Sequence, residues 1–156
     1  MRLKTKFSLV TDLSELRKVS KKVDLQDKGL VYHLTKVLKS AYEKLDGKLQ
    51  GLAAIQLGEH YSAVLLRYTK DNPPEVIFNP EVLFCLGNKI SNEGCLSEGD
   101  GRYNVKRPRL IYVRYFNENC EEVKEWLTYK KARIFMHEYD HTKGILLQDK
   151  SITVNY

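Results

Sequence analysis

The stretch MHEYDH, residues 136–141, constrains this chain most, because it places two histidines four residues apart. On an α-helix, residues at this spacing lie on one face, offset by about 40°. His137 and His141 can therefore aim both imidazoles at one metal ion, while Glu138 can reach an attacking water without binding the metal itself. The pattern predicts a helix with a catalytic metal site, and the alternative is a chance match on a surface helix.

Two histidines do not complete a catalytic metal site, so a third ligand must come from another segment. His33 lies in an apolar-rich helical segment and His60 in a loop, and either residue type can bind a metal. Cys95 is the stronger candidate, because the glycines around it in NEGCLSEGDGR permit a close backbone approach. A thiolate with two imidazoles makes a three-ligand site with one open position, the pattern of a catalytic metal.

The three cysteines are odd in number and widely spaced, which argues against a disulfide framework and for a reducing compartment. Cys85 falls in the apolar run VLFCL and is predicted to be a small core residue. Cys120 lies in a predicted hairpin loop and is given no role.

The length of 156 residues fits one domain with one core, predicted to span residues 1–156. No apolar run approaches the roughly 20 residues that cross a bilayer. The opening MRLKTKFSLV lacks the apolar stretch of a signal peptide. We therefore expect no membrane partner.

The net charge of +6 comes from lysines and arginines that are scattered along the chain. A positive surface favours approach to nucleic acid or a ribosome. No basic run is interleaved with aromatic residues, however, so we expect a solvated helix face and a charged edge strand. No specific nucleic-acid partner is predicted.

Apolar periodicity predicts a short helical turn within residues 12–23 and an amphipathic helix from Gly29 to about Leu45, where Asp46-Gly47 is a stop signal. The middle of the chain is rich in β-branched and aromatic residues. Strands are predicted there at residues 62–69, 76–80, 81–86, 110–116 and 122–127, the last two joined by a hairpin loop at 117–119.

Thr128 can cap a second helix that runs from Tyr129 to about His141, and Gly144 suits its C-terminal end. A helix, a run of strands and a second helix in this order predict an α+β domain rather than alternating βαβ units.

Three segments resemble the motifs of peptide deformylases, in the same order and at compatible distances: GLAAIQLG (51–58), EGCLS (93–97) and HEYDH (137–141). The flanking segments at 16–24, 78–82 and 132–149 are also similar, so the resemblance spans nearly the whole chain. It implies antiparallel β-sheets wrapped around a central metal-binding helix, with the amphipathic helix N-terminal to them.

The resemblance implies an enzyme that removes the formyl group from the N-terminal formyl-methionine of nascent polypeptides and releases formate. It implies Cys95, His137 and His141 as the metal ligands and Glu138 as the general base and acid. Ferrous iron is the implied physiological metal, with Zn²⁺, Ni²⁺ or Co²⁺ as replacements, whereas ligand softness alone favours zinc. Asp140 either orients a ligand from behind or faces solvent.

Gln56 and the backbone N–H of Leu96 are implied to share the negative charge that develops on the formyl oxygen. The alternative for Gln56 is a polar residue that closes a turn. The N-formylmethionyl peptide is expected to bind as an added strand beside Gly51. The residues implied around the methionine pocket are Glu93, Gly94, Arg102 and Ile134, although Arg102 alternatively pairs with Glu93.

Some residues depart from the family pattern without touching a ligand or Glu138. Leu49 replaces the first glycine of the first motif, Met136 stands where Gln or His is common, and Thr142 replaces a leucine. The loop after Cys95 contains Glu98-Gly99-Asp100 without the common proline, and is expected to be acidic and more mobile. We expect an active enzyme with altered peptide preference.

The chain leaves no room for the C-terminal helix that docks some bacterial members on the ribosome. Compact members without that helix occur in organelles and phages. We therefore expect a compact form in a bacterial cytoplasm, phage-infected hosts included, with transient ribosome proximity.

Two other functions compete with this interpretation. A zinc metallopeptidase shares H-E-x-x-H but usually takes a further His or Glu downstream, and none follows His141. A deformylase-like protein that binds nascent peptides without turnover is expected to have lost a ligand or the base, and all of them are present.

Overall fold

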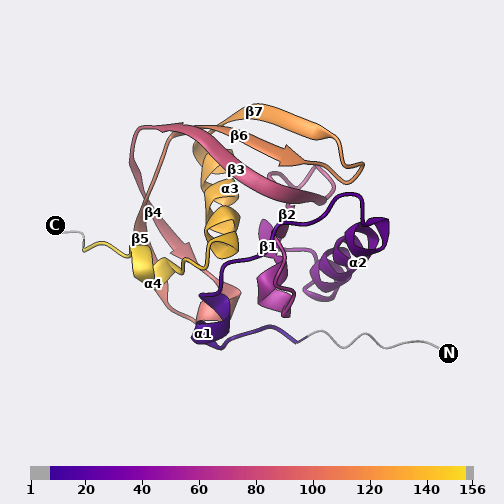
Figure 1. Ribbon diagram of the computed structural model, residues 1–156. Coiled ribbons are helices and arrows are strands. Elements are labelled where there is room, and N and C mark those ends of the chain that lie inside the picture. Colours follow the sequence, from indigo (N-terminus) through magenta and orange to yellow (C-terminus); the bar gives the residue numbers. More distant parts are fainter. Residues whose placement is uncertain (1–7, 154–156) are drawn as a thin grey trace.

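The computed structural model describes residues 8–153 and packs one helix, α3, against two antiparallel sheets (Figure 1). The larger sheet has the strand order β1-β2-β3-β6-β7, and β4 and β5 form the smaller sheet. The strands are β1 Gly51–Ala53, β2 Ala63–Leu66, β3 Glu75–Leu86, β4 Lys89–Gly94, β5 Arg102–Arg107, β6 Leu110–Phe116 and β7 Glu122–Thr128. The α-helices are α1 Leu13–Leu16, α2 Lys28–Lys44, α3 Tyr129–Thr142 and α4 Leu147–Lys150, with short 3₁₀ turns at Ala54–Leu57 and Leu96–Glu98.

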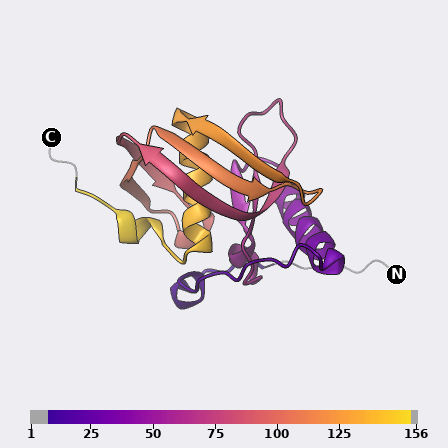
Figure 2. The same cartoon turned by 45° about the horizontal axis from the view of Figure 1, so that its top comes forward.

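This architecture confirms the predicted α+β class with a central helix. Strands β3, β6 and β7 form a curved layer over α3, and the β4–β5 hairpin flanks the same helix (Figure 2). None of the helices in residues 8–153 has the length and apolar character that a membrane span requires.

Helix α2 confirms the predicted amphipathic helix. It begins after Asp27, whose side chain accepts a hydrogen bond from the Leu30 N–H at 3.0 Å and so caps the helix. Its apolar face is buried against β1, β2 and β3, which explains the spacing of the apolar residues: Val31, Leu34, Leu38, Ala41 and Tyr42.

The two strands predicted at 76–80 and 81–86 are one strand, β3, so the predicted break between them is wrong. Asn79 has a φ of 51°, and the pairing with β6 shifts register between Phe78 and Glu81, which marks a β-bulge. The Asn79 side chain holds the bulge by accepting from the Val23 N–H at 2.8 Å and donating to the Val23 carbonyl at 3.0 Å. A bulge lets Pro80 stand inside a paired strand without ending it.

The prediction that Cys85 is a core residue is also wrong, because its side chain is exposed. The last four residues of β3 extend beyond the core, and Phe84 there contacts Trp126 on the solvent face of the sheet, with ring centroids 5.9 Å apart. The strand predicted at 62–69 is shorter, at Ala63–Leu66, and β1, β4 and β5 were not predicted.

Helix α3 begins and ends close to the predicted residues. Thr128 occupies the predicted N-cap position, but its side chain makes no capping hydrogen bond. The predicted position is therefore right and the predicted side-chain cap is wrong. The Tyr129 N–H instead donates to the Arg109 carbonyl at 2.9 Å. Gly144 ends the helix with a φ of 71°, and a Cβ there would lie 2.2 Å from the Arg17 carbonyl oxygen. Glycine is therefore required at this end.

Candidate metal centre and active site

Helix α3 and the turn after β4 bring three metal-binding side chains together. One ligand atom from each of Cys95, His137 and His141 lies within 4.8 Å of the other two. The two imidazole rings come from successive turns of α3 and have centroids 5.2 Å apart. Thiolate and imidazole donors at these separations fit one divalent metal ion and leave a position open to the pocket. Within residues 8–153 no other group of three His, Cys, Asp or Glu side chains meets this spacing.

His141 presents a neutral imidazole to this centre. Its Nε2 lies 3.4 Å from the Cys95 Sγ, and its Nδ1 is buried without a hydrogen-bond partner among the described residues. Burial, together with the nearby His137 and Arg107, lowers the pKa of His141 to about 3. The ring therefore keeps a lone pair for a metal across the physiological pH range.

His137 is oriented from behind by a buried carboxylate. Its Nδ1 lies 2.9 Å from Glu93 Oε1, which leaves Nε2 facing the centre. Burial alone would raise the pKa of Glu93, but hydrogen bonds from His137 and Arg107 outweigh it and lower the pKa to about 2. Burial likewise opposes charge on His137, yet contacts with Cys95 and Glu93 raise its pKa to about 10 when no metal is bound. A metal ion at Nε2 competes with that proton.

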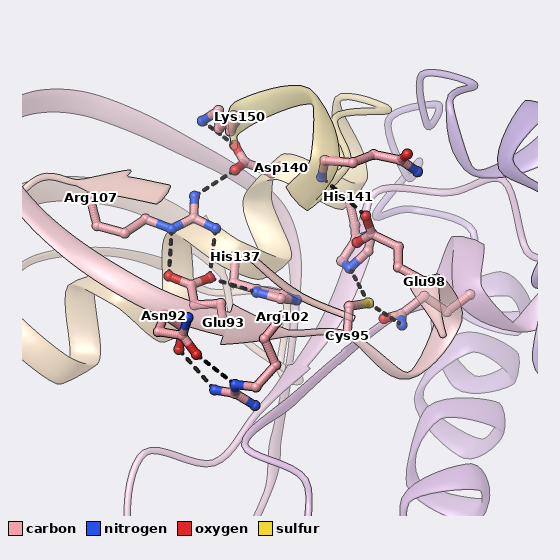
Figure 3. A network of polar contacts seen from close by, with 12 residues as sticks. Asn92, Glu93, Cys95, Glu98, Arg102, Arg107, His137, Asp140, His141 and Lys150 are labelled. Carbon is pink, nitrogen blue, oxygen red and sulfur yellow. Dashed lines mark hydrogen bonds and ion pairs between the residues drawn. The ribbon is translucent and has the colours of Figure 1, made fainter. Parts of the chain in front are cut away.

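Glu93 belongs to a buried charge network that runs behind the ligands to the C-terminal helix α4 (Figure 3). Arg107 donates to both Glu93 oxygens, at 2.8 and 2.9 Å, and to Asp140 Oδ2 at 2.6 Å. Lys150 of α4 completes the network by donating to Asp140 Oδ1 at 2.9 Å. All but Lys150 and His137 have side chains less than a tenth exposed, so nearly every charge here is desolvated and paired.

This network changes two expectations. Arg102 does not pair with Glu93, because its guanidinium donates to the Asn92 side chain at 2.6 Å and to the Asn92 carbonyl at 2.9 Å. Asp140 does not face solvent, and it reaches His137 only through Arg107 and Glu93. Arg107 was missed from the sequence, although alternation along RYNVKR places it on the same face of β5 as the buried Val105.

Glu138 lies at the bottom of the pocket in a position suited to proton transfer. Its side chain is buried, and its Oε2 has no hydrogen-bond partner among residues 8–153. Burial raises the pKa of Glu138 to about 7, against the lowering effect of His137 and Arg107. The backbone of Gly51 packs on this carboxylate so closely that a Cβ there would lie 2.6 Å from Glu138 Oε1.

Gln56 closes the turn after β1 and also reaches the metal centre. Its Oε1 accepts from the Ala53 N–H at 2.9 Å, which closes the 3₁₀ turn after β1. Since the oxygen is occupied, the amide nitrogen points at the centre, 3.6 Å from Cys95 Sγ and 3.1 Å from the Ser97 hydroxyl. Gln56 is thus a buried N–H donor beside the third ligand.

A pocket of about 580 Å³ opens from this centre to the surface. The residues predicted for substrate binding all line it: Gly51, Glu93, Gly94, Arg102 and Ile134. The buried Gln56 and Glu138 lie at its inner end with His137, and Leu96 also lines it. The Glu93 oxygens are already held by Arg107 and His137, so Glu93 can serve a substrate only through the ligand it positions.

The remaining sequence candidates lie elsewhere. His33 pairs with Glu59 at 2.8 Å, and His60 lies 3.4 Å from Glu15, so neither is the third ligand. Of the departures from the family pattern, Leu49 lines the pocket, as do Gly99 and Asp100 of the loop after Cys95. Met136 packs against the core cluster below the sheet, and the Thr142 hydroxyl donates to the Tyr139 carbonyl.

Comparison with known proteins gives one consistent result. The model of the family described as polypeptide deformylase matches residues 8–155. A peptide deformylase of Pseudothermotoga lettingae is 37% identical over 135 residues, which cover 86% of this chain and 75% of the relative. Peptide deformylase 1 of Clostridium acetobutylicum is 36% identical, over 86% of this chain and 87% of the relative.

Solved structures with the same architecture carry the same name. The crystal structure of peptide deformylase from Thermotoga maritima superimposes with a TM-score of 0.83 at 30% identity, over 94% of this chain and 98% of that one. A probable peptide deformylase from Synechococcus phage S-SSM7 has a TM-score of 0.83 at 29% identity, over 93% and 99% of the two chains.

Proposed function

The chain belongs to the polypeptide deformylase family of metal-dependent hydrolases, and from this premise we propose how its residues divide the catalytic work. Its activity is the removal of the N-formyl group from nascent polypeptides. The convergence of donor atoms from Cys95, His137 and His141 carries the assignment of roles. These three residues bind the metal, and Glu138 is the general base and then the general acid.

A divalent metal bound there supplies Lewis-acid activation of the formyl carbonyl and of the attacking water. Glu138 takes the proton from that water and delivers it to the amine that leaves. A pKa near 7 suits both transfers at neutral pH, because the carboxylate accepts and releases a proton with little cost in either direction. The close backbone of Gly51 keeps the carboxylate in place during the two steps.

The negative charge that develops on the formyl oxygen is shared by two N–H groups. The Gln56 amide is held by Ala53, so its nitrogen is oriented before the substrate arrives. The backbone N–H of Leu96 is the second donor, at the start of the 3₁₀ turn that follows Cys95. Loss of one such donor typically lowers kcat by about 100- to 1000-fold.

The metal in the cell is ferrous iron in this proposal, and Zn²⁺, Ni²⁺ or Co²⁺ can replace it. A thiolate with two imidazoles binds all of these ions. Metal analysis of protein purified without oxygen tests this assignment, and zinc at full occupancy in protein from iron-replete cells would contradict it.

The catalytic assignment is tested by formate release from formyl-Met-Ala-Ser, with metal content measured in the same samples. We expect Glu138→Gln to keep its metal and lose at least about 100-fold in kcat, the range of general acid–base catalysis. Cys95→Ser should lose metal. Glu59→Gln, a surface change beside His33, is the matched control and should keep both properties.

Other outcomes favour the competing functions. Internal cleavage of unformylated peptides would support a peptidase, and metal-loaded wild type that releases no formate would support a binding protein. Turnover by Glu138→Gln at the wild-type rate would remove Glu138 from its role.

We infer the cellular setting from the relatives. Residues 1–156 act as one catalytic domain in the cytoplasm of a bacterium, phage-infected hosts included. Bacterial and phage relatives support this setting. Approach to the ribosome is transient, and co-sedimentation with ribosomes that carry a formylated nascent chain tests it.

A further inference from the structure

The mouth of the pocket carries cations from three different segments of the chain. Lys48 precedes β1, Arg102 begins β5, and Arg133 lies on α3 one turn before His137. All three line the pocket. Asp100 is the one acidic lining residue outside the inner end that Glu93 and Glu138 occupy.

These cations keep their charge available to a ligand. In the described part of the chain none of the three has a carboxylate within ion-pair distance, in contrast to Arg107. Arg102 is held by neutral groups, the side chain and carbonyl of Asn92, which fix its position without neutralising it. Arg133 is half-buried, so its contact with water is reduced.

The path of the substrate brings its later residues to this mouth. The formyl end must lie at the metal ligands, and an extended peptide advances about 3.3 Å per residue. A pocket of about 580 Å³ has room for more than one residue, so the residues after methionine leave past the cations. A formylated N-terminus carries no positive charge that would oppose this interaction.

We propose that Lys48 and Arg133, together with Arg102, make this enzyme prefer formyl-methionyl peptides that have acidic side chains directly after the methionine. The inference rests on the proposed function and names the substrate class that it serves. Charge complementarity of this kind raises the rate of productive encounter and weakens with added salt. Each exposed ion pair of this kind is expected to change kcat/KM several-fold rather than by orders of magnitude.

The test uses peptides of the form formyl-Met-Xaa-Xaa-Ser with Xaa as Glu, Gln or Lys and an amidated C-terminus, which removes the competing terminal carboxylate. In low salt we expect kcat/KM to fall from Glu to Gln to Lys, by about tenfold in total. The difference should reside in KM, because the charges lie away from the reacting atoms. It should shrink severalfold in 0.5 M NaCl.

Charge-reversal variants give the decisive comparison. Arg133→Glu and Lys48→Glu should each reduce the ratio of Glu to Lys turnover, and together they should invert it. Lys70→Glu, an exposed change on the loop between β2 and β3 and outside the pocket, is the matched control and should leave the order intact.

Equal turnover of the three peptides would overturn the acidic preference while it upholds the deformylase function. A preference that survives both charge reversals would equally overturn the role of these cations. If no formylated peptide is hydrolysed, the proposed function fails, and calorimetric binding of the same three peptides still decides the preference.

Discussion

The buried network behind the inner end of the pocket and the mouth of the pocket both carry charged side chains, but only those of the network are paired with opposite charges. Behind the inner end, Arg107 is buried between Glu93 and Asp140, and each carboxylate oxygen of these two residues has a donor at 2.6 to 2.9 Å. At the outer end, Lys48 and Arg133 have no carboxylate partner in the described chain.

The difference follows from what each end must hold. A metal ligand has to keep one ring orientation, so the groups behind His137 are paired before any metal or substrate arrives. The mouth meets a variable peptide, and a charge already neutralised there has little effect on which peptide binds. Changes at the inner end should therefore alter stability and metal binding, and changes at the mouth should alter selectivity.

The strongest way to break this comparison is Arg107→Met. The change leaves Glu93 and Asp140 buried without their shared cation, and removal of one partner from a buried pair typically costs about 3–5 kcal/mol of unfolding free energy. Urea denaturation measures the loss, and metal retention should fall with it. Arg102→Met, five residues earlier on the same strand, should cost under about 1 kcal/mol, because its guanidinium is bound to Asn92 at the surface. Equal losses of unfolding free energy in the two variants would contradict the distinction between the buried network and the mouth.

A fall in pH should reduce the stability that the buried network contributes before it changes the charge of the cations at the mouth. The pKa of Glu93 is about 2 in the folded protein, against an ordinary value of 4.5, since hydrogen bonds from His137 and Arg107 outweigh its burial. A lowered folded pKa gives stability that is present above pH 4.5 and is lost as the pH falls toward 2, about 3 kcal/mol in total. Denaturation between pH 6 and 2.5 measures this loss. Glu93→Gln should be less stable at pH 6 and show a flatter profile, and an unchanged slope would show that another group carries the acid sensitivity.

The two regions also differ in how far the sequence predicts them. The spacing of His137 and His141 is local, so a helical repeat is enough to align them, and the glycines around Cys95 indicate a close approach. The structure brings these three side chains together. The network behind them depends on the β4–β5 hairpin and on α4, which meet only in the folded chain. Arg107 was therefore missed.

The errors in the predicted strands have the same origin. Cys85 lies in an apolar run, but β3 is long enough to leave the core, and no local pattern marks where the core ends. The bulge at Asn79 depends on hydrogen bonds to Val23, which is 56 residues earlier in the chain. Periodicity predicts which face of an element is apolar, whereas such long-range contacts decide where that element stops.

Gly51→Ala should move Glu138, the proposed general base, without touching a metal ligand. A Cβ at this position would lie 2.6 Å from Glu138 Oε1 and 2.7 Å from its Cγ, so the carboxylate has to shift. Displacement of a catalytic group by about 1 Å can cost about 100-fold. We expect that loss in kcat for formate release, with metal content unchanged. Gly29→Ala in the exposed first turn of α2, where the nearest atom is 3.5 Å away, should keep full activity. Loss of metal from Gly51→Ala would show that the change reaches the ligands instead.

Lys150→Met tests the point where the buried network meets solvent, and its effect should be the smallest. The Lys150 side chain is 34% exposed, whereas its partner Asp140 is 7% exposed, so the pair lies between the buried network and an ordinary surface pair. We expect a loss of about 1 kcal/mol, the upper end for exposed pairs. Lys150→Arg should restore most of it, because the donor is kept. Lys18→Met removes the surface pair with Glu15 at 2.7 Å and should cost almost nothing, since both of those side chains are at least 40% exposed. If Lys150→Met cost as little as Lys18→Met, Arg107 alone would be enough to stabilise the buried Asp140 carboxylate. The network of paired charges would then not extend to α4.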